Sequence, residues 1–319
     1  MKRAAVILLL LCLIPAAAFA LDPRLSAMGD TGIAVSGPDM NSYPNPAAVY
    51  FDENTFTFAV YTALSDTAAK HSIPYLPGSS SGVLFVADMI TIGIEMNLQS
   101  RNFREDTGNV DLFRTTQIRV NMGAGIGHIS AGVGITGGST RQRLDVVMDD
   151  VADLFVQSLL APYTRVLNSE FIQVDAGLLL NYNRLNVGIL MENIISRDGT
   201  DTSFNLGTLF AETGVGLYWS LPEYGARGRM NNLVYSLALE FDNVFDRDAQ
   251  VIKAGGEVRL RLVRDSSVSL RGGCQFYFSG ERRFTAGVSV NLKKIEMFIN
   301  GDFPIEQDAV IQAGAIARL

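Results

Sequence analysis

The sequence predicts an all-β protein: a transmembrane antiparallel β-barrel of about fourteen strands with an N-terminal plug. Three observations predict it. The chain is apolar, with 48% hydrophobic residues and a mean hydropathy of +0.19, yet beyond its first twenty residues it lacks the run of about eighteen apolar residues that a membrane helix needs. From Thr55 onward, apolar and polar or small residues alternate, as in strands with two different faces. The connections between these strands alternate between short and long, which is typical of outer-membrane barrels.

The first twenty residues, 1–20, have the features of an export signal. Lys2 and Arg3 form a basic start, Ala4 to Ile14 are apolar, and Ala18-Phe19-Ala20 is a small-x-small cleavage site. Without the two basic residues, 24 Lys and Arg remain from 26, against 33 acidic residues, so the mature chain has a net charge of −9. This charge argues against nucleic acid as a partner.

The alternation continues through most of the mature chain. Ile90, Ile92 and Ile94, for example, alternate with Thr91 and Gly93. One face of each strand is therefore apolar, and the other carries small or charged residues. We expect strands at 55–63, 82–87, 90–98, 112–124, 128–138, 170–182, 185–195, 211–221, 232–243, 250–263, 267–278, 283–291, 295–302 and 308–318.

The length of a connection depends on whether the strand before it has an odd or an even number. After even-numbered strands the connections are short, as at Asn183-Arg184, with the exception of 222–231. After odd-numbered strands several are long, namely 64–81, 99–111, 139–169 and 196–210. Short periplasmic turns and long outer loops have this pattern, so we expect the protein in the outer membrane of a diderm bacterium.

Fourteen strands enclose more space than wall side chains can fill. We therefore expect the apolar faces to point to lipid and the mixed faces to line a polar lumen. Residues 21–54 are rich in Gly, Pro, Asn and Ser and too few to form a domain. They are expected to plug the barrel that residues 55–319 form.

The plug region contains a motif. Gly29 and Gly32 are followed by Asp39 and then by Asn45-Pro46-Ala47. This pattern resembles the start of the FadL-like long-chain fatty-acid transporters, which are fourteen-stranded outer-membrane barrels with an N-terminal plug. The resemblance implies a plug or gating role for these six residues. Alternatively they only fix one turn, since Asn45 can cap a short helix that begins at Pro46.

The connection 139–169 carries apolar residues at helical spacing. An amphipathic helix is expected there, with Leu144, Val147, Val151, Leu154 and Phe155 near one side. In the resembling family, outer loops capture the lipid first, so these apolar residues are candidate ligand contacts. A helix that only packs on the barrel rim has the same pattern.

Four basic residues on two neighbouring strands lie at the alternate positions whose side chains are expected to face the lumen: Lys253, Arg259, Arg261 and Arg271. They could bind a fatty-acid carboxylate. The same parity also carries acidic residues, which favours an internal salt-bridge network: Asp175, Glu192, Glu240, Asp242, Glu257 and Glu296. The glycines of 132–137 match a nucleotide-binding pattern only formally, because no βαβ unit surrounds them. They are expected to form a narrow strip where the plug approaches the wall.

Catalysis is not expected. With only His71 and His128 present, neither a metal site nor a catalytic triad is apparent, and no cofactor is implied. We expect a monomer in outer-membrane lipid, folded by the barrel assembly machinery, that passively imports a hydrophobic small molecule such as a long-chain fatty acid. The alternatives are a non-transporting scaffold for protein partners, like the shuttle component of type IX secretion, and a small-solute porin.

Overall fold

A computed structural model describes residues 23–35, 44–51, 55–65, 78–87, 90–104, 109–147, 165–198, 205–206, 212–221, 232–263, 266–305 and 309–318. These contain two short helices, α2 (Pro23–Ala27) and the 3-10 helix η1 (Pro46–Phe51). The strands are β1 (Thr55–Ser65), β2 (Gly78–Ala87), β3 (Ile90–Arg104), β4 (Asn109–Ile126), β5 (Ile129–Val147), β6 (Arg165–Tyr182), β7 (Leu185–Asp198), β8 (Asn205–Leu206), β9 (Thr213–Ser220), β10 (Leu233–Asp242), β11 (Val251–Val263), β12 (Ser266–Tyr277), β13 (Arg282–Leu292), β14 (Ile295–Pro304) and β15 (Val310–Arg318).

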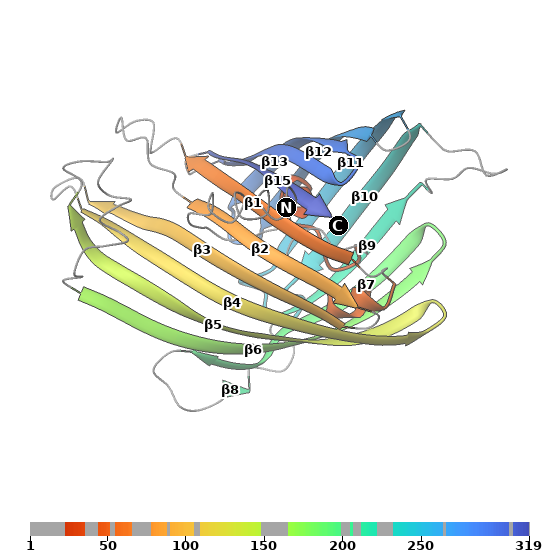
Figure 1. The fold of residues 1–319 in the computed structure, drawn as a ribbon. Coiled ribbons are helices and arrows are strands. Elements are labelled where there is room, and N and C mark those ends of the chain that lie inside the picture. Colours follow the sequence, from red (N-terminus) through yellow and green to blue (C-terminus); the bar gives the residue numbers. More distant parts are fainter. Residues whose placement is uncertain are drawn as a thin grey trace, which may run out of the picture.

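Fourteen of these strands form a closed ring (Figure 1). Consecutive strands pair antiparallel, and β7 pairs with β9 because the two-residue β8 only flanks β7. The ring closes where β1 pairs with β15, as at Val60↔Ala315. The predicted all-β fold of about fourteen antiparallel strands is confirmed.

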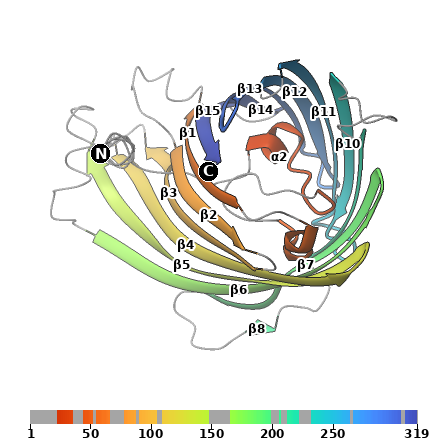
Figure 2. The same cartoon turned by 45° about the vertical axis from the view of Figure 1, so that its right-hand side comes forward.

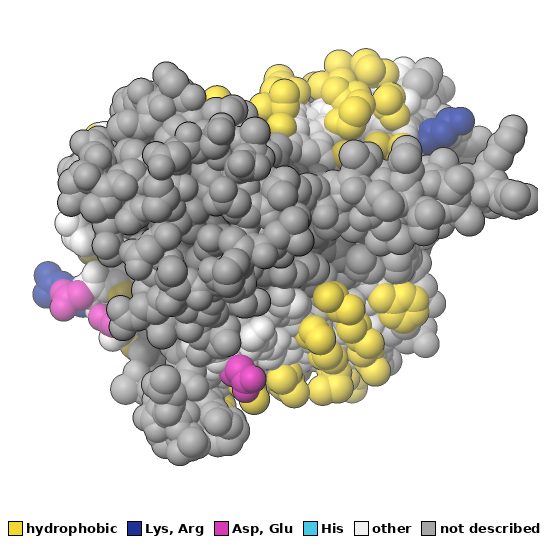
Figure 3. Space-filling model, turned by 60° about the vertical axis from the view of Figure 1, so that its left-hand side comes forward, with side chains coloured by type: hydrophobic (Ala, Val, Ile, Leu, Met, Phe, Trp, Pro, Cys, Tyr) yellow, Lys and Arg dark blue, Asp and Glu magenta, His cyan; other side chains and the backbone are white. Residues whose placement is uncertain are grey.

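The two faces of the wall have opposite character. Large apolar side chains such as Ile92, Ile118 and Leu237 are exposed on the outside. Figure 3 shows hydrophobic side chains gathered on the described parts of one face of the barrel. Polar side chains such as Asn121 and Glu240 are buried on the inside. A lipid-facing apolar belt and a polar lumen have this arrangement. Among the described residues, no helix is long and apolar enough to cross a membrane.

Several strands are longer than the sequence predicted, and the three longest follow one another. β4, β5 and β6 have 18, 19 and 18 residues, because cross-strand pairing continues past the apolar belt into polar sequence. The prediction of a helix from Leu144 is therefore wrong at its start: Leu144 and Val147 lie in β5, paired with Arg165 and Asn109. Val151, Leu154 and Phe155 lie outside the described residues.

Residues 23–35 and 44–51, here called the inner segment, lie within the ring (Figure 2). Met28, Ala34, Ala47 and other apolar residues of the inner segment form one buried cluster with wall residues. The wall residues of this cluster are Leu84, Leu179, Tyr218 and Ala238. Since these come from β2, β6, β9 and β10, the inner segment packs against opposite sides of the barrel.

Candidate functional site

Glycines on the inner face of the wall receive the inner segment. A Cβ at Gly255 would lie 2.0 Å from the carbonyl oxygen of Met28, and a Cβ at Gly188 would lie 2.2 Å from that of Ile33. Such distances are too short for any side chain, so the backbones meet only because these positions are glycine. We call the set the glycine cradle: Gly123, Gly132, Gly177, Gly188, Gly216, Gly255, Gly273 and Gly287. Of the strip expected at 132–137, only Gly132 belongs to it: a Cβ at Gly134 would meet Asn121 of the wall, and one at Gly137 would meet nothing within 4 Å.

Valine at Gly132 should displace the inner segment. Its Cβ would lie 2.4 Å from the carbonyl carbon of Pro46. Overpacking of this kind costs about 1–3 kcal/mol, so Gly132→Val should unfold in less urea and conduct more ions across planar bilayers. The matched control is Gly137→Val on the same strand, where a Cβ would meet nothing within 4 Å. Equal effects of the two substitutions would contradict the cradle.

The side chain of Asn45 links the inner segment to the wall through hydrogen bonds. Its side-chain amide donates to the carbonyl oxygens of Ile33 at 2.8 Å, Leu178 at 3.1 Å and Ile189 at 3.2 Å. Its Oδ1 accepts from the backbone N–H of Ala47 at 3.0 Å, which caps η1 as predicted. One fully buried side chain therefore links both halves of the inner segment to β6 and β7.

The two motif glycines lie at close contacts as well. Gly29 has a φ of 75° and its N–H donates to Thr285 Oγ1 at 2.9 Å. A Cβ at Gly32 would lie 2.7 Å from Pro44 Cγ. Of the six predicted motif residues, the structure thus brings together Gly29, Gly32, Asn45, Pro46 and Ala47 within the inner segment, whereas Asp39 lies outside the described residues.

An ion-pair network ties α2 to the wall. Arg24 pairs with Glu257 at 3.1 Å, and Arg271 pairs with Glu257 at 3.1 Å and with Glu296 at 2.8 Å. Arg259 also reaches Glu257, at 3.3 Å. Two of the four predicted basic residues, Arg259 and Arg271, therefore lie in a salt-bridge network of the kind that the sequence offered as an alternative.

Lys253 lies in a second polar cluster further along the lumen. Its Nζ is 2.6 Å from Asp242 Oδ2 and donates to the carbonyl oxygen of Asp30 at 3.3 Å. Gln275 donates to the Asp30 carboxylate, and Glu240 accepts from the backbone N–H of Ile33. Sequence reasoning missed Arg24 and Asp30, because the plug region has no two-residue alternation to indicate which way a charged side chain points.

Burial raises the pKa of the Asp30 carboxyl from 3.8 to about 6, although nearby Lys253 lowers it. The folded state then binds more protons than the unfolded state between about pH 4 and pH 6, so stability falls as pH rises through this window. We expect Asp30→Asn to flatten this dependence in urea unfolding at about pH 4 and pH 7. An unchanged slope would show that other groups cause it.

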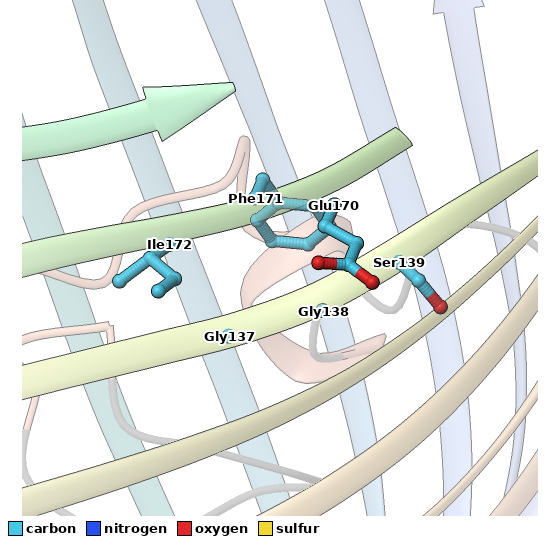
Figure 4. Close-up of a pocket in the computed structure, with 6 residues that line it drawn as sticks. All are labelled: Gly137, Gly138, Ser139, Glu170, Phe171 and Ile172. Carbon is cyan, nitrogen blue, oxygen red and sulfur yellow. The ribbon is translucent and has the colours of Figure 1, made fainter. Parts of the chain in front are cut away.

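A small cavity of about 220 Å³ opens in the wall between β5 and β6 (Figure 4). It is lined by Gly137, Gly138, Ser139, Glu170, Phe171 and Ile172. This volume is below the range of about 300–1,000 Å³ that is usual for small-molecule sites. Among the residues that the structure describes, no His, Cys, Asp and Glu cluster could hold a metal ion.

The closed ring, the outer apolar belt and the polar interior define the class: the protein is an outer-membrane β-barrel of a diderm bacterium. No protein-family model matches the sequence, and no curated protein matches it. In fold it is similar to the toluene transporter TodX of Pseudomonas putida, with a TM-score of 0.53 and 11% identity over 95% of this chain and 98% of that chain.

A Pseudomonas aeruginosa FadL homologue is also similar, with a TM-score of 0.50 and 8% identity over 96% of this chain and 97% of that chain. Identities this low show a shared fold alone. The resemblance to FadL-like barrels is confirmed at that level.

Proposed function

We propose that the protein is a passive uptake channel for hydrophobic small molecules, with residues 21–54 as its plug. The observation that carries the proposal is the inner segment itself, which lies across the lumen of an inside-out barrel and is fitted to a glycine cradle. Similar barrels are named as a toluene transporter and a FadL homologue, which supports a hydrophobic substrate.

Long-chain fatty acids are the first substrate class to test, as the FadL-like motif implies. In this proposal the apolar residues Val151, Leu154 and Phe155 would contact the ligand at the outer rim. The arginines of the lumen, among them Arg259 and Arg271, would meet its carboxyl group after the plug shifts. Transport would involve no covalent chemistry.

The test is uptake of radiolabelled oleate by cells that carry the protein in their outer membrane, compared with cells that carry an empty vector. We expect faster uptake with the native chain, and a further change with Gly132→Val, which perturbs the plug, but not with Gly137→Val. Oleate uptake equal to that of the empty-vector cells, from a correctly folded barrel, would contradict the fatty-acid assignment.

A second candidate is a scaffold that binds protein partners and transports nothing. The many bonds of Asn45, Arg24 and Asp30 to the wall favour it, because they hold the inner segment in one place. This scaffold would be favoured if both the native protein and Gly132→Val took up every hydrophobic compound only at the level of empty-vector cells.

A further inference from the structure

Charged groups of the inner segment and of the wall from β10 to β14 are divided between the two ends of the lumen. Two sets are defined by the end of the strands at which they lie. The loop-end set, near the connections after β10, β12 and β14, comprises Asp30, Glu240, Asp242, Lys253, Glu281, Arg283 and Asp302. The turn-end set, which extends from the middle of β11 and β12 to the short turns after β11 and β13, comprises Arg24, Glu257, Arg259, Arg261, Arg271 and Glu296.

Besides the buried Glu240, the loop-end set has four carboxylates against two cations, a formal charge of −2. Its ion pairs do not use every carboxylate oxygen: Oδ1 of Asp30, Oε2 of Glu240 and Oδ1 of Asp302 are buried without a hydrogen bond. Glu240 is only 2% exposed. Buried acceptors in excess of donors produce a negative potential in this part of the lumen.

The turn-end set has the opposite charge. Four arginines face two glutamates, which gives a formal charge of +2. Arg24 and Asp30 stand at the two ends of the same short stretch of the inner segment, and each contacts the set that lies at its own end of the lumen. Residues 24–30 of the inner segment therefore extend from the positive set to the negative one.

We propose that this charge division selects the substrate: the loop end admits neutral and cationic hydrophobic molecules and excludes ionised carboxylates. The inference rests on the proposed uptake function, with the loop end facing outward as outer-membrane barrels require. Low-dielectric walls focus the potential of fixed charges into the lumen, so a like-charged head group is repelled before it reaches the inner segment. A fatty acid would then cross the loop end in its neutral form and meet arginines only beyond it.

The experiment compares three compounds with one alkyl chain: dodecanol, dodecylammonium and dodecanoate. Initial uptake is measured at neutral pH in cells that carry the native protein, and uptake by empty-vector cells is subtracted. We expect dodecanol and dodecylammonium to enter about tenfold faster than dodecanoate. Uptake of dodecanoate at the rate of dodecanol would overturn the selectivity alone. If dodecanol does not enter above the empty-vector level, the uptake function is overturned as well.

The double variant Asp30→Asn/Asp302→Asn should raise dodecanoate uptake relative to dodecanol by about tenfold. Its matched control is Asp246→Asn/Asp248→Asn, which removes the same charge from the exposed turn between β10 and β11. A similar rise in the control would show a general surface effect and overturn the proposal. Should the double variant fail to fold, Asp302→Asn alone, which leaves the inner segment intact, is expected to raise the ratio about threefold, and an unchanged ratio would overturn the proposal.

Discussion

Arg271→Met is expected to destabilise the barrel by about 3–5 kcal/mol, because it removes the cation from buried ion pairs and leaves their carboxylates in place. Arg271 lies 7% exposed between Glu257 and Glu296 and reaches both carboxylates. Methionine has a similar length but no charge, so two buried carboxylates lose their shared cation. Urea unfolding in lipid vesicles, followed by the fluorescence of the single tryptophan, Trp219, measures the loss.

Two further variants make this prediction specific. Arg184→Met removes a positive charge from an exposed turn and should change stability by less than about 0.5 kcal/mol. The double variant Arg271→Met/Glu296→Gln should recover part of the loss, since it neutralises one of the two carboxylates that have lost Arg271. Equal stability of Arg271→Met and Arg184→Met would show that the network contributes nothing.

Asn45→Asp should cost about 3–5 kcal/mol and detach the inner segment from the wall. The substitution keeps the shape and the cap to Ala47, but it removes both N–H donors and turns a carboxylate oxygen toward the carbonyls of Ile33, Leu178 and Ile189. An unpaired buried charge among acceptors is strongly unfavourable. Hydrogen exchange of Ala47 and Ala48 should rise together with the loss in unfolding free energy.

The control for Asn45→Asp is Asn183→Asp, in the exposed turn between β6 and β7. Asn183 has a φ of 56°, which aspartate also tolerates, so the control should be close to neutral. If Asn45→Asp unfolds in the same urea concentration as Asn183→Asp, then Asn45 does not hold the inner segment.

Local sequence was sufficient to predict most of the wall. Two-residue alternation predicted the strands and their faces, and a dipeptide such as Asn183-Arg184 predicted a tight turn, since its asparagine adopts positive φ. The lengths of β4 to β6 were underestimated because their outer ends are polar. Such ends are held by pairing to neighbouring strands, which the strand's own composition does not indicate.

The site was predicted only in part, for a related reason. Gly29, Gly32 and Asn45 stood out as a motif, and parity pointed Glu240 and Arg271 inward. Parity could not indicate which inward groups meet, because that depends on the stagger of strands far apart in the sequence. Likewise Gly188, Gly255 and Gly273 are ordinary strand glycines until the inner segment is seen against them.

The unequal strands have a consequence for the surrounding membrane. At about 3.3 Å per residue and a tilt of about 40°, the eight residues of β9 rise only about 20 Å, whereas the nineteen of β5 rise nearly 50 Å. A typical hydrocarbon layer is about 30 Å thick. Over the residues that the structure describes, the wall is therefore lower beside β9 than beside β5, and lipids that match both heights would give the bilayer a thickness gradient around the barrel. A barrel with one low side tilts in its membrane and has a preferred direction for neighbours that share the thinned patch.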